Sequence, residues 1–310
     1  MASKIHWTEN SWNPLVGCSR ISAGCKNCYA ESAAKSARLQ QFPQYQSVKE
    51  WDGTIEFVEN QLLKPLSWKS PKKIFVCSMS DIFHANVEDE WLNKIFAVMA
   101  IASQHTFQVL TKRPERMQEY FALHKGKPEC YASRSEMVFD AVKEIKPQAE
   151  WDKFIWPLPN VWLGTSIENQ KAADDRIALL LQTPATVRFL SCEPLLELVD
   201  LRQYLGVCVG CQTCDFQGGH PIAESKINWV IVGGESGTGA RPCEIDWLRS
   251  IISQCKSAKV AVFVKQLGSM PMADAPIDYE HDLMRVKLKD RKGGDIDEFY
   301  EDLKVRQLPQ

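Results

Sequence analysis

The sequence predicts an α/β fold whose parallel strands form a partial or complete (β/α) barrel. Three observations favour this fold class. Short apolar runs rich in Val, Ile and Phe recur along the 310 residues, which is typical of strands that are buried on both faces. Most runs are followed by an amphipathic helical pattern, and this alternation implies right-handed crossovers. Polar residues follow nearly every run, as the active site of a barrel requires, whereas a doubly wound sheet would gather them at one switch point.

The predicted elements alternate along most of the chain. Six apolar runs are expected to be strands, at residues 74–77, 107–110, 161–163, 187–190, 229–232 and 260–264. Amphipathic stretches are expected to be helices at residues 89–103, 114–124, 169–182 and 246–258, and a shorter helical stretch occupies residues 29–39. Together they predict a barrel of six to eight strands within residues 1–268.

Two stretches interrupt the alternation, and a polar tail follows it. Residues 125–159, which contain four prolines, and residues 198–228, which contain a cysteine cluster, are interpreted as insertions. Residues 269–310 are interpreted as a C-terminal extension packed on the barrel.

Composition excludes several classes of protein. Hydrophobic residues make up 45% and charged residues 25%, which excludes disordered and fibrous proteins. The 37 Lys and Arg against 39 Asp and Glu exclude a basic polyelectrolyte but leave room for a local basic groove. Because no apolar run resembles a signal peptide or a membrane span, we expect a cytoplasmic protein with no membrane partner. Eleven cysteines in that compartment favour metal or redox chemistry over disulfides.

Three cysteines near the N-terminus have the spacing of a metal site. Cys18, Cys25 and Cys28 form C-x6-C-x2-C. Three thiolates from one loop can hold three corners of a cubane 4Fe-4S cluster and leave the fourth iron without a protein ligand. Zinc is one alternative, because C-x2-C is half of a zinc knuckle, but its other ligands would have to come from far along the chain. Purely structural thiols are the third interpretation.

The residues around these cysteines resemble a known family. The opening motif Ser11-Trp12-Asn13-Pro14, Gly17-Cys18, Cys25 and Cys28-Tyr29-Ala30, with later blocks at 230–237, 240–242 and 263–268, is similar to that of phage-associated radical S-adenosylmethionine (radical SAM) proteins. The resemblance implies a radical SAM-type barrel, a 4Fe-4S cluster, SAM bound at the open iron, and an electron donor of the flavodoxin or ferredoxin type. The first cysteine gap departs from the superfamily, whose commonest spacing there is three residues rather than six.

The resemblance and the strand ends together give candidate cofactor-binding residues. The resemblance implies that Tyr29 packs against the adenine of SAM, and Ser80 and Asp81 stand where the family binds the methionine ammonium. Polar residues and glycines at other predicted strand ends are expected to contribute as well: Lys112, Arg113, Thr165, Ser166, Glu168, Glu193, Gly233 and Gly234. The alternative for each is a structural role, because residues at strand ends also cap the next helix.

A second cysteine cluster lies in the later insertion. Cys208, Cys211 and Cys214 form C-x2-C-x2-C, and His220 follows six residues later. The histidine favours a tetrahedral zinc, whereas the short spacing favours a second iron-sulfur cluster, so both remain open. Cys192, at a strand end, is a further candidate, as a hydrogen-atom donor or a fourth ligand. Two isolated cysteines, Cys77 and Cys255, are expected to be core residues.

The sequence therefore predicts a radical SAM-type enzyme. The cluster on Cys18, Cys25 and Cys28 would pass one electron to SAM, and the resulting 5'-deoxyadenosyl radical would take a hydrogen atom from a substrate at the barrel mouth. Glu235 and Lys265 are expected to be catalytic, with Glu235 facing cofactor or substrate and Lys265 placing an ammonium at the mouth. The phage association suggests a nucleobase or a nucleic-acid lesion as one substrate class.

The alternative is a metal-binding, nucleic-acid-binding module without radical chemistry. Such a module would stack aromatic rings on a nucleic-acid strand and neutralise its phosphates, here with Trp7, Trp12, Tyr29, Lys112, Arg113 and Arg241. The sequence predicts neither the reaction product nor the oligomeric state.

Overall fold

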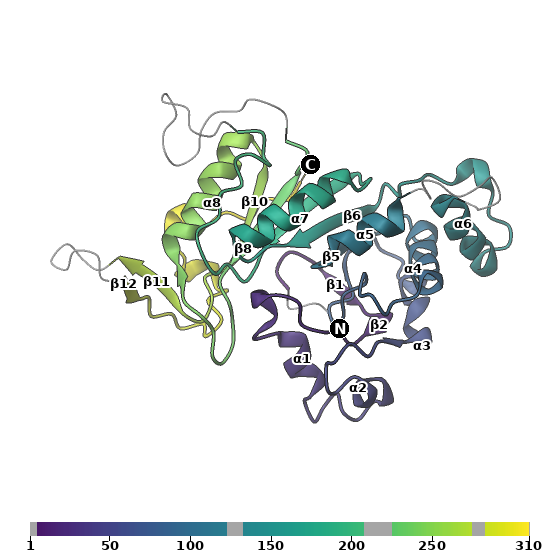
Figure 1. The fold of residues 1–310 in the computed structure, drawn as a ribbon, viewed down its shortest axis with the longest axis horizontal. Coiled ribbons are helices and arrows are strands. Elements are labelled where there is room, and N and C mark those ends of the chain that lie inside the picture. The colour runs from purple at the N-terminus through teal and green to yellow at the C-terminus, as the bar shows by residue number, and fades with distance from the viewer. Residues whose placement is uncertain (1–4, 123–132, 208–224, 275–282, 310) are drawn as a thin grey trace. The chain divides into compact units, whose positions relative to one another are not determined.

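The structure, a computed structural model, describes residues 5–122, 133–207, 225–274 and 283–309 (Figure 1). The chain divides into two compact units. Unit 1 comprises residues 1–21, 28–165 and 179–186, and unit 2 comprises residues 22–27, 166–178 and 187–310. The cysteine motif therefore contributes Cys18 and Cys28 to unit 1 and Cys25 to unit 2.

The main feature of the fold is a seven-stranded sheet whose strands follow one another in chain order. Its strands are β1 (Asn10–Trp12), β4 (Lys73–Val76), β5 (Thr106–Thr111), β6 (Val161–Ser166), β7 (Val187–Cys192), β8 (Trp229–Gly233) and β10 (Ala261–Gln266), and they pair in parallel. Because the order never reverses, the sheet has no switch point, and its winding is that of a barrel. The predicted fold class, an α/β fold with the parallel strands of a partial barrel, is confirmed.

All six strands predicted from apolar runs are present, with ends that shift by at most three residues. The seventh strand, β1, escaped prediction because only one of its three residues, Trp12, is apolar. That residue is 1% exposed, its ring lies 5.6 Å from the Phe107 ring, and its indole N–H donates to the Gln61 carbonyl at 2.8 Å. One buried aromatic ring thus fixes a strand that has no sequence periodicity.

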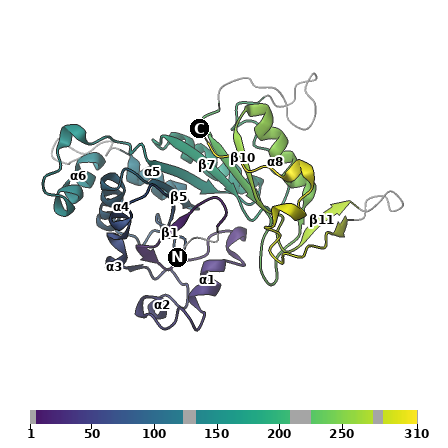
Figure 2. The same cartoon turned by 180° about the vertical axis from the view of Figure 1, so that it is seen from behind.

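Unit 1 contains several helices around its strands. They are α1 (Tyr29–Ala34), α2 (Pro43–Ser47), α3 (Glu59–Leu62), α4 (Asp89–Ile101), α5 (Pro114–Phe121) and α6 (Arg134–Ile145), with 3-10 turns η2 (Lys64–Ser67) and η3 (Trp151–Lys153). Helix α6 packs beside α4 (Figures 1 and 2). Its first turn is closed by a capping box between Ser133 and Glu136, which explains why the stretch interpreted as an insertion contains a helix.

A small apolar cluster supports the first and last cysteines of the motif. Cys18 and Cys28 pack against buried residues that include Val16 and Val48. Val16 belongs to β2 (Leu15–Val16), which pairs with β3 (Glu56–Phe57). Gly17, directly before Cys18, has φ +97°, and a Cβ there would lie 2.1 Å from the Thr54 carbonyl oxygen. Only glycine therefore lets the chain enter the cysteine loop at this point.

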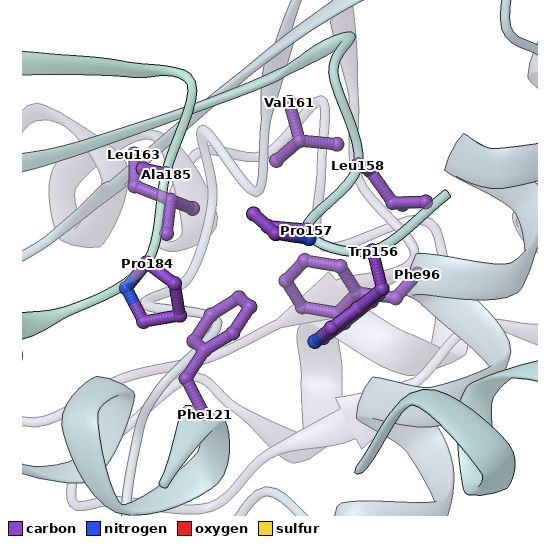
Figure 3. A pocket seen from close by; sticks show the side chains of 9 residues that line it. All are labelled: Phe96, Phe121, Trp156, Pro157, Leu158, Val161, Leu163, Pro184 and Ala185. Atoms are coloured by element: carbon purple, nitrogen blue, oxygen red, sulfur yellow. The ribbon is translucent and has the colours of Figure 1, made fainter.

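A small apolar cavity lies in unit 1 between α4, α5, β6 and the loop before β6 (Figure 3). Its volume is about 10 Å³, which is near the lower limit for one water molecule. Figure 3 shows the Phe121 ring beside Pro184, and the other lining residues are also apolar. Since the walls place no convergent polar groups around the space, we interpret it as a packing gap rather than a binding site.

Unit 2 contains β7, β8, β10 and the helix α8 (Ile245–Ala258), which packs on β8 and β10 (Figure 1). The helix buries Leu248, Ile251 and Ile252, as its apolar spacing predicted. Helix α7 (Gln170–Gln182) has residues in both units. The remaining elements of unit 2 are η1 (Ala23–Cys25), β9 (Cys243–Glu244), β11 (Pro271–Asp274), β12 (Leu283–Arg285), η4 (Ile296–Glu298) and η5 (Glu301–Leu303).

The C-terminal segment pairs with the edge strand β10. The Val264 amide donates to the Val305 carbonyl, and the Gln307 amide donates to the Val262 carbonyl. This antiparallel pairing covers an edge that would otherwise present unpaired backbone groups. Leu303, the last residue of the turn just before this pairing, is fully buried. Within the described ranges, no helix combines the length and apolar character that a membrane crossing requires.

We expect Leu303→Ala to lower the free energy of unfolding by about 2–5 kcal/mol, because it leaves a cavity under the C-terminal segment. Urea unfolding followed by tryptophan fluorescence measures the change. Leu308→Ala is the control, since Leu308 is 39% exposed and its loss should stay within about 0.5 kcal/mol. Equal effects of the two substitutions would contradict a structural role for this segment.

Candidate functional site

Asp81 joins the carboxyl ends of β4 and β5 in unit 1. One of its carboxylate oxygens accepts from the Thr111 hydroxyl at 2.6 Å and the Phe83 amide at 3.1 Å. The other accepts from the Lys112 amide at 2.9 Å and the Arg113 guanidinium at 3.0 Å. A carboxylate has about four acceptor sites, so the chain itself fills them. A ligand ammonium, the predicted partner of Asp81, would have to displace one of these donors.

Arg113 connects Asp81 to the first cysteine. The guanidinium nitrogen that contacts Asp81 also lies 3.6 Å from the Cys18 sulfur, and the other terminal nitrogen donates to the Ser19 carbonyl at 2.9 Å. Burial, together with the Asp81 charge, raises the pKa of the Cys18 thiol to about 11, although Arg113 opposes the shift. In the metal-free protein, Cys18 is therefore a protonated thiol at neutral pH.

The Ser19 hydroxyl lies between Arg113 and His84. Arg113 donates to it at 3.1 Å, and the His84 Nε2 lies 2.8 Å from it. The Asn86 amide donates to His84 Nδ1, so the neutral ring carries its hydrogen on Nε2 and donates to Ser19. Burial, and then the Arg113 charge, lower the pKa of His84, which favours the neutral ring. Sequence analysis missed Ser19 because it is one of the unspecified positions of the cysteine motif, and it missed His84 because that residue stands in no motif.

Ser80 and Tyr29 connect the cysteine segment to the loop after β4. The Ser80 hydroxyl donates to the Gly17 carbonyl at 2.6 Å, and the Tyr29 hydroxyl donates to the Ser78 carbonyl at 2.8 Å. The Ser80 hydrogen is thus committed to the backbone. The Tyr29 residue is 58% exposed, so its ring presents an aromatic surface on which a base could stack.

Three other predicted residues have structural positions. Thr165 is buried and donates to the Thr111 carbonyl at 2.9 Å. The Ser166 carbonyl accepts from the Arg176 guanidinium at 2.7 Å. Gly234 allows two backbone segments to approach, because a Cβ there would lie 2.3 Å from the Leu267 carbonyl oxygen.

In unit 2, Glu168 and Glu235 contact the segment that carries Cys25. The Gly24 amide donates to Glu168 at 3.2 Å, and the Asn27 side-chain amide donates to Glu235 at 2.9 Å. Each carboxylate also pairs with an arginine, Arg176 at 3.0 Å for Glu168 and Arg241 at 2.6 Å for Glu235. Burial raises the pKa of Glu235, but the hydrogen bonds from Arg241 and Asn27 outweigh it and lower the pKa overall. Both carboxylates therefore face groups of the protein.

Glu193, Lys265 and Gly233 come together at the carboxyl ends of β7, β8 and β10. The Lys265 ammonium lies 3.0 Å from Glu193 Oε1, and the Ser191 hydroxyl lies 3.4 Å from Oε2. The Oε1 contact lacks hydrogen-bond geometry, so it is electrostatic. A Cβ on Gly233 would lie 2.9 Å from Glu193 Oε1, so the glycine makes room for the carboxylate. Three residues predicted separately thus form one cluster.

The cysteines divide into exposed and core thiols. Cys18, Cys25 and Cys28 are partly exposed thiols, whereas Cys77, Cys192 and Cys255 are buried. Burial raises the pKa of the Cys192 thiol well above its ordinary value, which identifies a neutral core residue. Among the described residues, no three His, Cys, Asp or Glu side chains are grouped so that they could hold a metal. The second cluster, Cys208, Cys211, Cys214 and His220, lies outside the described residues.

The fold and these contacts define an α/β protein with barrel-type winding, charged strand ends and a loop that carries thiols. A family model described as a protein of unknown function (DUF5131) matches residues 2–302, and the chain belongs to this family. No curated protein and no solved structure matches the chain.

We expect alkylation of Cys18 in the metal-free protein to depend steeply on pH. The thiolate is the nucleophile, so with a pKa of about 11 the rate should rise roughly tenfold per pH unit between neutral pH and that value. Asp81→Asn removes a negative charge and should lower the pKa, whereas Arg113→Leu removes a positive charge and should raise it. Iodoacetamide labelling followed by peptide mass spectrometry resolves each cysteine.

Lys49→Met, an exposed substitution in the same unit, is the control and should leave the profile unchanged. A flat pH profile for Cys18, or faster labelling in Arg113→Leu, contradicts the electrostatic assignment.

Proposed function

We propose that this protein is a radical SAM-type enzyme in which Cys18, Cys25 and Cys28 hold a 4Fe-4S cluster. The observation that carries the proposal is the loop itself, which has three thiols within eleven residues, each outside a disulfide. The chemistry of the donors fits the group, because three thiolates are the ligands of a cluster with one open iron. In the metal-free structure the three thiols are not grouped, so binding would have to bring them together. When bound, the cluster supplies one electron to SAM at that iron.

Arg113 has a direct role in this proposal. Metal binding requires that Cys18 lose its proton, and burial opposes that loss. A guanidinium 3.6 Å from the sulfur favours the thiolate, so Arg113 lowers the free energy of deprotonation. Asp81 acts in the opposite direction on the thiol but orients the guanidinium through their 3.0 Å contact.

The Lys265–Glu193 pair and Tyr29 are the proposed ligand-binding groups. The Lys265 side chain is 24% exposed and the Glu193 side chain 11% exposed, so the ammonium is the more accessible charge. Such an ammonium can bind a carboxylate or phosphate of the cofactor or substrate while Glu193 orients it. The exposed ring of Tyr29 suits the adenine of SAM.

The proposal includes partners and a second metal. An electron donor of the flavodoxin or ferredoxin type would reduce the cluster. A nucleobase or nucleic-acid lesion is the proposed substrate class, on the basis of the phage association alone. Cys208, Cys211, Cys214 and His220 are proposed to hold zinc or a second iron-sulfur cluster.

The alternative, a nucleic-acid-binding module, loses several of its predicted contacts. Trp7 is 4% exposed and Trp12 is 1% exposed, so neither ring can stack on a base. Arg113 and Arg241 are each paired with a buried carboxylate, which reduces the charge that they offer to phosphates. The structure therefore favours the enzyme over the binding module.

We expect Cys25→Ala to abolish the cluster of the cysteine loop, because two thiolates cannot hold a cubane that already lacks one protein ligand. The measurement is iron content and charge-transfer absorption after anaerobic reconstitution with iron and sulfide. The parent protein and the Cys25→Ala variant both carry Cys211→Ala, so that iron at the second cluster does not contribute. Cys255→Ala is the control, since that thiol lies in the core.

An iron content in Cys25→Ala equal to that of the parent protein would contradict the assignment of the cluster to Cys18, Cys25 and Cys28. The radical step has its own test, which is formation of 5'-deoxyadenosine from SAM after chemical reduction of the reconstituted protein. A full cluster without 5'-deoxyadenosine would leave a metal protein that is not a radical SAM enzyme.

We expect Lys265→Met to weaken SAM binding or substrate turnover by roughly tenfold or more, the effect of losing a charge-assisted contact. Calorimetric titration of the reconstituted protein measures SAM affinity, and 5'-deoxyadenosine formation measures turnover. Lys256→Met, an exposed substitution on α8, is the control. If Lys265→Met only lowers the free energy of unfolding, the ion pair is structural.

A further inference from the structure

Arg241 and Glu235 form a hydrogen-bonded ion pair in unit 2. The Arg241 Nε and its backbone amide both donate to Glu235 Oε2 at 2.9 Å, and one terminal nitrogen donates to Oε1 at 2.6 Å. The remaining terminal nitrogen donates to the Ala23 carbonyl at 2.9 Å. The pair therefore holds the backbone two residues before Cys25.

Asn27 extends the same network to the other side of Cys25. Its side-chain amide donates to Glu235 Oε2 at 2.9 Å and to the Gly239 carbonyl at 3.0 Å. With Asn27, Glu235 accepts from four donors, three on Oε2 and one on Oε1, and the residue is 6% exposed. Its carboxylate is thus occupied by groups on both sides of the cysteine.

Glu168 holds the residue between Ala23 and Cys25. Its side chain is 1% exposed, and it accepts from the Gly24 amide at 3.2 Å and from Arg176 at 3.0 Å. A Cβ on Gly24 would lie 3.1 Å from the Glu168 carboxyl carbon, which is tighter than an ordinary contact. Glycine at this position lets the backbone approach the carboxylate closely.

We propose that Glu168 and Glu235 are positioning residues that hold the segment Ser22–Asn27 in one conformation before any metal binds, and that neither is a cofactor ligand. This inference rests on the proposed function in one respect, which is that the ligand of Cys25 is a metal. Ordering a loop costs conformational free energy, and a segment ordered in advance binds its ligand more tightly. Buried networks whose members are all bonded are the means by which proteins rigidify such segments.

The competing interpretation, in which these carboxylates bind the methionine ammonium of SAM, places that ammonium in competition with their arginine partners. At Glu235 the ammonium would share the carboxylate with Arg241 and Asn27, and at Glu168, whose side chain is 1% exposed, it would share the carboxylate with Arg176 and Gly24. Removing one partner of a buried charge pair is strongly unfavourable, because the other charge is then left without compensation. A positioning role requires no such exchange.

Hydrogen exchange of the metal-free, full-length protein tests the proposal. Asn27→Ala and Glu235→Gln should each raise the exchange rates of the Gly24, Cys25 and Lys26 amides by roughly tenfold or more, the effect of losing a hydrogen bond to a charged group. Asn60→Ala, an exposed asparagine of α3 in unit 1, is the matched control and should leave these amides unchanged. Asn27→Ala removes no charge, so it keeps the test available if Glu235→Gln does not fold.

A second measurement is iron retention. After anaerobic reconstitution with iron and sulfide, in proteins that carry Cys211→Ala, a chelator should strip iron from Asn27→Ala and Glu235→Gln roughly tenfold faster than from the parent protein. Urea unfolding should place Asn27→Ala close to Asn60→Ala. A general loss of stability would instead raise exchange throughout unit 2.

The outcomes separate this inference from the proposed function. Loop amides that exchange in the variants as they do in the parent overturn the positioning role, even if the parent binds a full cluster. Faster exchange confined to the loop supports the positioning role, even if the parent takes up no iron, and in that case the proposed cluster fails. Weaker SAM binding by Glu235→Gln, with loop exchange and iron retention unchanged, identifies Glu235 as a ligand and overturns the inference.

Discussion

The structure depends on a single kind of interaction at its strand ends, the buried carboxylate–arginine pair. Three pairs share one design: after bonding to the carboxylate, the arginine uses a further N–H to hold a backbone carbonyl. Arg113 pairs with Asp81 and donates to the Ser19 carbonyl. Arg176 pairs with Glu168 and donates to the Ser166 carbonyl, and Arg241 pairs with Glu235 and donates to the Ala23 carbonyl. Two of the three carbonyls belong to the cysteine loop. Because a buried charge without its partner costs several kcal/mol, the pairs and the loop backbone constrain each other.

These pairs select one backbone conformation, and they contribute little to the free energy of unfolding. A buried ion pair contributes little net free energy, since desolvation offsets much of its attraction. Stability comes instead from the apolar strands and from helices such as α8, which bury aliphatic side chains at regular spacing. The glycines complete the design: Gly17 and Gly24 admit the backbone to positions where a Cβ would meet Thr54 or Glu168. Apolar packing thus provides the scaffold, and the polar network selects one path for the loop.

The sequence predicted the strands because burial on both faces leaves a local signature, a short run of apolar residues. It could not predict β1, whose place depends on one tryptophan that packs against a distant strand. It also could not tell which polar residues at strand ends face a ligand. Asp81 and Arg113 are 32 positions apart, and nothing local to either records that they pair. The contact between Glu193 and Lys265 could not be predicted for the same reason, because the strands that bring them together are far apart in the chain.

A charged group that binds a ligand must lose its partners in the protein at a low cost in free energy. This criterion separates the predicted residues into candidates for ligand binding and residues that are bonded within the protein. Asp81 has two donors on each of its oxygens, and Glu235 has three donors on Oε2 and one on Oε1, so exchange of partners there would break well-formed hydrogen bonds. The Lys265 ammonium lies 3.0 Å from Glu193 Oε1, and the Lys265 side chain is 24% exposed. A ligand anion can approach that ammonium from solvent. In the proposed function, ligand therefore binds at the ends of β7, β8 and β10, while the carboxylates beside the cysteines are proposed to keep the loop in place.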